Sequence, residues 1–143
     1  MKNDFIFGLI QTIDGEKDPR NLLVAFELFV ITVKTIPEFT RFTEELFEIV
    51  SCYFPITFKP RAEDPDAITA EELSAALRAC ICATPAFAPF CFSFLLDKLG
   101  SSIVAAKFES LSTICQCCYF GPTVVAPYLN QIWRGLHTEV FDW

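Results

Sequence analysis

Cysteine is the residue type most able to bring chemistry to this chain, because seven thiols occur in 143 residues. Cys115, Cys117 and Cys118 lie close together, as do Cys80 and Cys82, and grouped thiolates ligate zinc and iron–sulfur clusters. Residues two apart on a helix point about 200° from one another, so only Cys115 and Cys118 are spaced to share a metal.

The same two thiols also fit a packing role. Cys115 and Cys118 lie on an apolar helical stripe, where free cysteine acts as a small hydrophobe. No second CxxC pair and only one histidine are available as further ligands. We therefore predict that they pack in the core and that the chain has no metal site or cofactor, with a thiol metal-binding or redox protein as the alternative.

The remaining candidate catalytic residues have structural explanations. His137 has no nucleophile or carboxylate beside it in a known motif, so a helix-surface histidine is expected. The glutamates at 44–48 and 71–72 fall on polar faces of amphipathic helices rather than forming an acid–base pair. No glycine-rich phosphate loop, nucleophile elbow or HExxH is present. An enzyme is not expected.

One turn is rich in charge. Its charged residues are Asp14, Glu16, Lys17, Asp18 and Arg20. Helix capping and local ion pairing explain most of them, and a contact with a partner protein is the alternative interpretation.

Composition limits the classes of partner. A net charge of −7 opposes direct binding to nucleic-acid phosphates and favours partners with basic patches. Mean hydropathy is high at +0.39, but the charge-free runs 79–96 and 110–133 are interrupted by prolines or by Gly121-Pro122, so no membrane span is expected. The first apolar run is too short for a secretory signal, and an odd number of cysteines fits reduced thiols inside the cell.

Helix signals divide the chain into seven apolar-periodic segments without a strand pattern. Asp18-Pro19 starts one helix, Pro37 ends it, and Thr69 with Glu72 forms a capping box. Four segments carry predicted inner stripes. These are Leu22, Leu23, Phe26, Phe29, Val30 and Val33; Phe39, Phe42, Leu46, Ile49, Val50 and Tyr53; Leu73, Leu77, Cys80 and Ile81; and Val104, Phe108, Leu111, Cys115 and Cys118. The final segment places Val125, Leu129, Ile132, Leu136 and Val140 on its inner face.

The segments repeat as helix pairs. The pairs fall near 3–36, 38–83 and 86–119, followed by an unpaired helix at 123–142, and an insertion loop at 54–68 interrupts the second pair. A period of about 40 residues with two helices per unit is typical of HEAT or armadillo repeats. We predict an all-α helical-hairpin solenoid of about three and a half pairs over 1–143. It is expected to be a fragment of a longer solenoid, with Trp133, Phe141 and Trp143 incompletely covered.

Several irregular stretches carry a resemblance to a known family. They read DGEKDPRNLL at 14–23, CYFPITFKP at 52–60, DPDAIT at 64–69, ALRA at 76–79, ATPAF at 83–87, DKLGS at 97–101, AKFESL at 106–111 and YLNQIWRGLHTEVF at 128–141. In order and over nearly the whole chain, they resemble the HEAT-repeat adaptor of the cytosolic iron–sulfur protein assembly targeting complex. That family is also known from methyl-methanesulfonate sensitivity and nucleotide excision repair.

The resemblance implies a non-enzymatic scaffold in the cytoplasm and nucleus. Its implied partners are the iron–sulfur assembly subunits and apo-protein clients in DNA replication, repair and transcription. This chain resembles part of the amino-terminal half, whereas docking to the other assembly subunits is associated with the carboxy-terminal repeats of the family. No individual site residue transfers, so the partner-binding residues remain unknown, and an unrelated HEAT-repeat transport or regulatory scaffold is the alternative.

Overall fold

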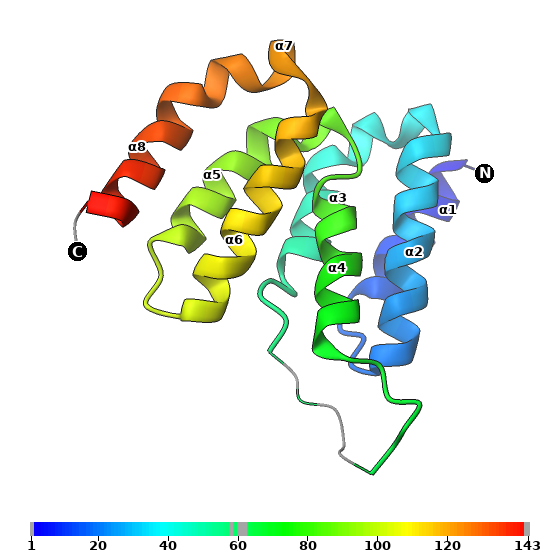
Figure 1. The fold of residues 1–143 in the computed structure, drawn as a ribbon. Helices are drawn as coiled ribbons and strands as arrows, with labels where there is room; N and C mark the ends of the chain where they lie inside the picture. The colour runs from blue at the N-terminus through cyan, green and yellow to red at the C-terminus, as the bar shows by residue number, and fades with distance from the viewer. Residues whose placement is uncertain (1, 58, 60–62, 142–143) are drawn as a thin grey trace.

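The computed structural model describes residues 2–57, 59 and 63–141, and these form helices joined by turns, without a strand among them (Figure 1). The α-helices are α1 (Lys2–Ile13), α2 (Pro19–Thr35), α3 (Thr43–Ser51), α4 (Ala70–Ile81), α5 (Ala88–Leu99), α6 (Val104–Cys117), α7 (Pro122–Val125) and α8 (Leu129–Phe141). Short 3₁₀ helices occupy Pro37–Phe42, Pro85–Phe87, Cys118–Phe120 and Ala126–Tyr128. The all-α prediction is confirmed.

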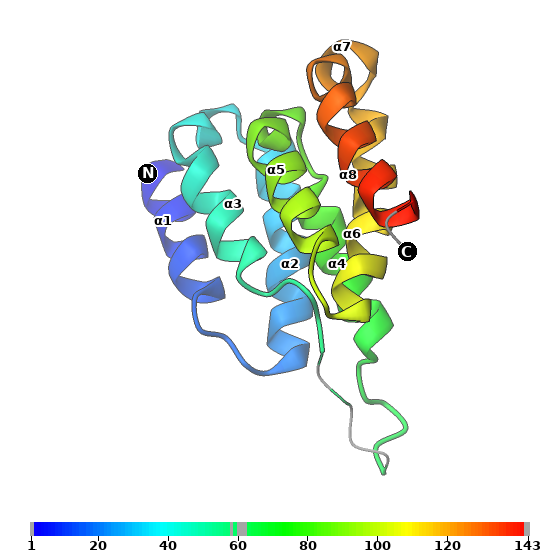
Figure 2. The ribbon, with the colours of Figure 1, turned by 90° about the vertical axis from the view of Figure 1, so that its left-hand side faces the viewer.

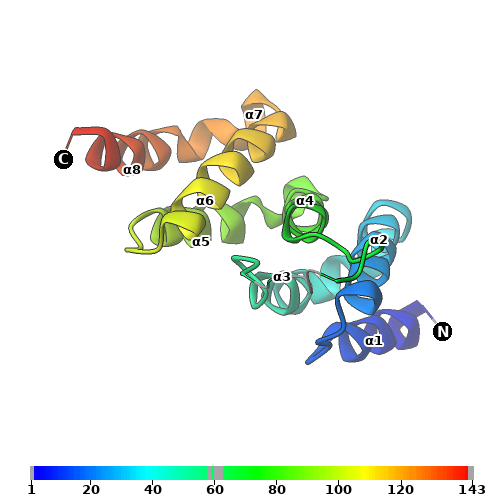
Figure 3. The ribbon, with the colours of Figure 1, turned by 60° about the horizontal axis from the view of Figure 1, so that its bottom comes forward.

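The helices stack in two layers. Helices α1, α3, α5 and α8 form one row and α2, α4 and α6 form the other (Figure 2). The pairs α1–α2, α3–α4 and α5–α6 pack across the two rows, and neighbouring helices within each row also contact one another. The array runs from α1 at one end to α8 at the other (Figure 3). This side-by-side stacking of helical hairpins makes the molecule an all-α helical-repeat solenoid.

Local sequence signals set the helix starts. Asp18 caps α2 by accepting a hydrogen bond from the Arg20 amide at 2.9 Å, and Pro19 occupies the first helical position. Thr69 and Glu72 form the predicted capping box of α4, in which each side chain accepts a hydrogen bond from the backbone amide of the other. Gly15 adopts a positive φ of 73°, which lets the chain turn sharply after α1.

Phenylalanine supplies much of the core between the layers. The side chains of Phe26, Phe29, Phe87 and Phe92 are fully buried. Phe47 of α3 places its ring 5.7 Å from that of Phe87, which joins the α3–α4 hairpin to the start of α5. The inner stripe predicted for α4 is buried throughout, and that of α2 is buried or half-buried. The stripe predicted for 38–53 is likewise buried or half-buried from Phe42 to Tyr53, and the Phe39 side chain lies outside the described residues.

The stripe predicted for α6 is wrong. Its members Val104, Phe108, Leu111, Cys115 and Cys118 are all exposed, Val104 by 78%. The helix instead buries the face made of Ala106, Ser110, Thr113, Ile114 and Cys117. Small side chains on this face let α6 lie closely against α5, and the larger apolar residues remain outside. Periodicity revealed an apolar face but did not reveal that the smaller, more polar face was the one that packs.

The last helix is covered on one side only. Of the predicted inner face, Val125 and Ile132 are buried, whereas Leu129 and Val140 are 56% and 62% exposed, contrary to that part of the prediction. Trp133 and Phe141 are exposed as expected, and Trp143 lies outside the described residues. Gly135 lies on the side of α8 that packs against α5. A Cβ at this position would stand only 2.6 Å from Leu96 Cδ2 of α5.

Within the described part of the chain, no single helix is long and apolar enough to cross a bilayer. Helix α4 and the segment Pro85–Leu99 meet the length and hydropathy requirement together, but an 85° bend separates them.

Candidate interaction surface

The seven cysteines lie in different environments. All are free thiols; Cys80, Cys91 and Cys117 are buried and Cys82 is half-buried, whereas Cys52, Cys115 and Cys118 are exposed. The packing role predicted for Cys115 and Cys118 is therefore wrong, because both follow the outward face of α6. Among the described residues, no three cysteine, histidine or acidic side chains are arranged to hold a metal ion.

Burial shifts the pKa of some of these thiols. It raises the pKa of Cys80, and it is the main cause of a raised pKa at Cys118. The pKa of Cys117 is raised first by its hydrogen-bonding contacts with neighbouring thiols and then by burial. The raised pKa values favour the neutral thiol of Cys80, Cys117 and Cys118 near neutral pH.

The other candidate residues take part in packing or capping. His137 is exposed on α8, with its ring centroid 4.5 Å from that of Phe141 and 5.9 Å from that of Trp133. Glu72 is engaged in the α4 capping box. Glu44 lies exposed in the first turn of α3, where a carboxylate complements the helix dipole. The structure does not bring these residues together into one site.

The charged turn between α1 and α2 is organised mainly by its own backbone. The Glu16 carboxylate accepts hydrogen bonds from the amides of Lys17 and Asp18, both at 2.9 Å. Arg20 reaches across to Asp64 with an Nη2–Oδ2 distance of 3.1 Å, although both side chains are well exposed. Backbone hydrogen bonds therefore account for Glu16 and Asp18, as capping predicted. The exposed ion pair of Arg20 is not local to the turn, because it connects the turn to the long α3–α4 connection.

Tyr53 holds the turn against the end of α3. Its hydroxyl lies 2.6 Å from the carbonyl oxygen of Ile13 and 3.0 Å from that of Glu16, and donates to these acceptors. Its ring packs edge-on to Phe26 with centroids 5.7 Å apart. Burial raises the pKa of the Tyr53 hydroxyl, so it remains a hydrogen-bond donor well into alkaline solution.

A surface hollow of about 350 Å³ opens beside Tyr53, and we call it the turn-end hollow. Its lining residues include Lys17, Pro19, Leu22, Tyr53, Ile56, Thr57 and Leu73. A second hollow of about 260 Å³ adjoins the same turn and shares Glu16, Lys17, Cys52 and Tyr53 with the first. The walls are mostly apolar, while the rim carries charge from Glu16 and Lys17. An apolar floor with a charged rim is the usual composition of a protein-binding surface.

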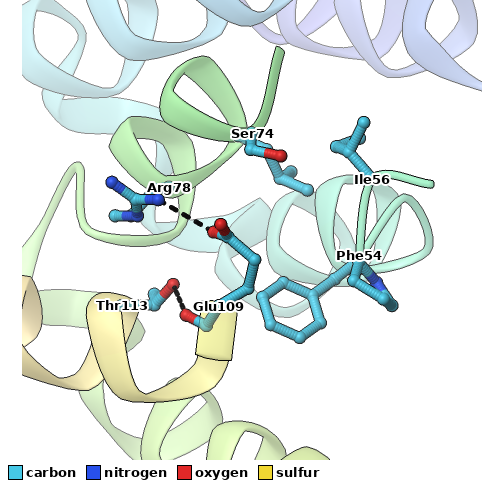
Figure 4. Close-up of a pocket in the computed structure, with 8 residues that line it drawn as sticks. Phe54, Ile56, Ser74, Arg78, Glu109 and Thr113 are labelled. Carbon is cyan, nitrogen blue, oxygen red and sulfur yellow. Dashed lines mark hydrogen bonds and ion pairs between the residues drawn. The ribbon is translucent and has the colours of Figure 1, made fainter. Parts of the chain in front are cut away.

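A narrow crevice continues from the hollow toward α6 (Figure 4). Pro55 and Ile56 line both features. Inside the crevice, Arg78 of α4 donates to Glu109 of α6 at 2.9 Å. The crevice leaves no room for a water molecule, so it functions as a joint between helix pairs rather than as a ligand site.

The turn-end hollow unites stretches that are far apart in the sequence. Segments 14–23 and 52–57 line it, and the Arg20–Asp64 ion pair joins the 64–69 stretch to its edge. Both the α1–α2 turn and the α3–α4 connection lie at the lower end of the molecule in Figure 1. Sequence reasoning did not identify this hollow. It could have been expected from the repeat pattern, because the turns within successive helix pairs lie along one edge of a solenoid.

Comparison with known proteins agrees with the resemblance of these stretches. Residues 1–142 match the MMS19_N family, described as Dos2-interacting transcription regulator of RNA-Pol-II. The chain is 46% identical over 141 residues to the MMS19 nucleotide excision repair protein homolog of Dictyostelium discoideum, covering 98% of this chain and 13% of that protein. It is 45% identical over 140 residues to the human homolog, covering 97% of this chain and 14% of the relative.

The Drosophila melanogaster MMS19 nucleotide excision repair protein is 43% identical over 142 residues, with coverage of 99% and 15%. The chain thus spans about one seventh of the length of these relatives. Because the family match extends over nearly every residue, including the irregular turns that form the hollow, the chain belongs to the MMS19 family.

Proposed function

We propose that this chain is part of a non-enzymatic scaffold for cytosolic iron–sulfur protein assembly. In this role it links the assembly machinery to apo-protein clients that act in DNA replication, repair and transcription. The observation that carries the proposal is the 42–46% identity to MMS19 relatives over nearly the whole chain. The iron–sulfur role is what the resemblance to the adaptor family implies.

The proposed role needs a binding surface rather than a reactive centre. A solenoid offers long edges on which turns from successive repeats meet a partner together. The turn-end hollow is such a place, since two helix pairs contribute to it and its apolar floor is accessible. Tyr53 fixes the geometry of this edge through two backbone carbonyl groups. We assign the chemistry of cluster delivery to partner subunits.

The net negative charge favours protein partners with basic patches and disfavours nucleic acid as a partner. The chain carries 18 acidic residues against 11 lysines and arginines, and direct phosphate binding would require the reverse balance. The relatives are named as nucleotide excision repair proteins and the family as a transcription regulator. The proposal therefore places this chain in the nucleus and, for assembly, in the cytoplasm. It includes no association with a membrane.

Affinity purification tests the proposal. The epitope-tagged polypeptide that contains this chain is purified from cells, and its associated proteins are identified by mass spectrometry. Iron–sulfur assembly subunits and apo-forms of iron–sulfur enzymes are expected. Transport GTPases in their place would favour an unrelated HEAT-repeat scaffold, and stoichiometric iron or zinc lost in a Cys115→Ala/Cys118→Ala variant would favour a thiol metal-binding protein.

Surface variants test the role of the hollow. Lys17→Glu and Thr57→Arg change exposed rim positions without touching the core. Lys34→Glu and Thr123→Arg make the same chemical changes at exposed positions that do not line the hollow, and serve as matched controls. A client or assembly subunit bound at the hollow is lost from the first pair and retained by the second. Equal recovery from all four variants would exclude the hollow as the contact.

A further inference from the structure

A group of three thiols lies inside the joint between the second and third helix pairs. Cys82 is the C-cap of α4, Cys91 lies in α5, and Cys117 is the last residue of α6. The Cys82 and Cys117 sulfurs are 2.8 Å apart, and the Cys91 sulfur is 3.8 Å from that of Cys117. Three helices therefore direct sulfur atoms to one point, which no single stretch of sequence reveals.

Cys82 and Cys117 are close enough to bond without rearrangement of the helices. A disulfide requires a sulfur–sulfur distance of about 2.05 Å, so the two atoms would approach by about 0.8 Å. Rotation about side-chain bonds supplies a displacement of that size. The distance from Cys91 to Cys117 is about 1 Å longer, which makes Cys91 the less favourable partner.

The two thiols differ in their access to solvent. Cys82 is half-buried, whereas Cys117 is fully buried. Hydrogen bonding between the thiols keeps Cys117 protonated, which favours the reduced pair as the resting state. A small oxidant can reach Cys82 first, and the buried Cys117 then stands beside the oxidised sulfur and screens it from other thiols.

We propose that Cys82 and Cys117 form a reversible disulfide that joins α4 to α6 when the chain meets a peroxide. In the first step the Cys82 sulfur takes one peroxide oxygen, giving a sulfenic acid and water as the O–O bond breaks. In the second step the Cys117 sulfur displaces the sulfenic oxygen, the S–S bond forms, and a second water leaves. The two sulfurs together lose two electrons and two protons, and the peroxide is reduced to two waters.

The bond would fix the orientation of adjacent helix pairs. At present α4 and α6 are joined by packing and by the Arg78–Glu109 ion pair. A covalent link between the C-cap of α4 and the last residue of α6 would add a second fixed point and prevent the two helices from sliding or rotating against one another. The loop that it closes runs from 82 to 117, so the crosslink would also restrict the unfolded chain. A thiol reductant such as glutathione would reverse the reaction by thiol–disulfide exchange.

Mass spectrometry tests the proposal on the 143-residue chain. Protein is treated with hydrogen peroxide, remaining thiols are alkylated, and the chain is digested with trypsin without reduction. Cys82 lies in the tryptic peptide 79–98 and Cys117 in 108–134. The expected product is these two peptides joined, with fragmentation placing the link at Cys82 and Cys117, and the joined species disappears when reductant is added.

Variants separate the proposed pair from general thiol oxidation. Cys82→Ser and Cys117→Ala are expected to lose the joined peptides, whereas Cys115→Ser, which alters an exposed thiol of the same peptide, retains them. Circular dichroism confirms that each variant is folded. Wild-type protein is also expected to gain several degrees in Tm after peroxide treatment, and Cys82→Ser is not.

Two results would overturn the proposal. One is that peroxide oxidises only the exposed thiols, while Cys82 and Cys117 of the wild-type chain stay free and are alkylated afterwards, a measurement that needs no variant. The other is that the joined peptides form at an unchanged rate in Cys82→Ser, which would assign the bond to another pair such as Cys91 with Cys117.

Discussion

The ion pair between Arg78 and Glu109 provides the sharpest test of how adjacent helix pairs are held together. The Arg78 Nη2 and Glu109 Oε2 atoms are 2.9 Å apart, and their side chains are only 25% and 18% exposed. The crevice around them has no room for water (Figure 4). Each charge therefore depends on the other for much of the stabilisation that water would otherwise supply.

The magnitude follows from this partial burial. Hydrogen bonds to charged groups contribute about 1.5–3 kcal/mol when buried, and residual exposure places this pair in the lower part of that range. We expect Glu109→Gln and Arg78→Met each to lower the free energy of unfolding by about 1.5–2 kcal/mol. Their coupling energy is expected to be about 1 kcal/mol, because the double variant leaves neither charge unpaired.

Urea unfolding followed by circular dichroism measures this coupling in a double-mutant cycle. The Arg20–Asp64 pair serves as a matched control, because its 3.1 Å separation is similar while its side chains are 65% and 41% exposed. The control cycle is expected to give a coupling below about 0.5 kcal/mol. If the two cycles give equal coupling energies, burial in the crevice does not strengthen the inner pair and the reasoning is refuted.

Three further predictions follow from buried and exposed groups. Ser110 is fully buried and its hydroxyl has no partner among the described residues, so Ser110→Ala is expected to raise the free energy of unfolding by about 1 kcal/mol, measured by urea titration. In the same assay, Ile114→Ala is expected to lower the free energy of unfolding by about 2–4 kcal/mol and Phe108→Ala by less than about 0.5 kcal/mol. The reverse order would indicate that α6 buries the stripe predicted from the sequence. Because the pKa of Tyr53 is raised in the folded state, its contribution is complete below about pH 10 and lost as pH rises through that raised value. Tyr53→Phe is therefore expected to lower the Tm near neutral pH but to flatten its decline above about pH 10, and an unchanged alkaline slope would contradict the assigned burial.

The sequence predicted helix starts better than helix faces. Capping chemistry is local, so Asp18, Pro19 and Thr69 could be interpreted without knowing what surrounds them. The face that a helix buries depends on its neighbours. Helix α6 has a large apolar face and a smaller one, and the close approach of α5 selected the smaller one, which contains Ser110 and Cys117.

The candidate surface was only partly predictable. The charged turn was recognised, and its capping role could be inferred from residue types and spacing. The contact of this turn with Tyr53 could not be predicted, because the Tyr53 hydroxyl bonds to Ile13, which is 40 positions away in the sequence. The thiol group at Cys82 and Cys117 was missed for the same reason, since sequence spacing links neighbours on one helix and not sulfurs from separate helices.

The two-layer stacking also bears on how the chain acquires its shape. Helices contact mainly their hairpin partner and the next helix of their own row, so the segments that meet belong to the same helix pair or to adjacent pairs. Closing short loops costs little entropy, and folds of low contact order form quickly. The α1–α2 and α3–α4 units can therefore assemble as they leave the ribosome, before the residues of α8 have been translated.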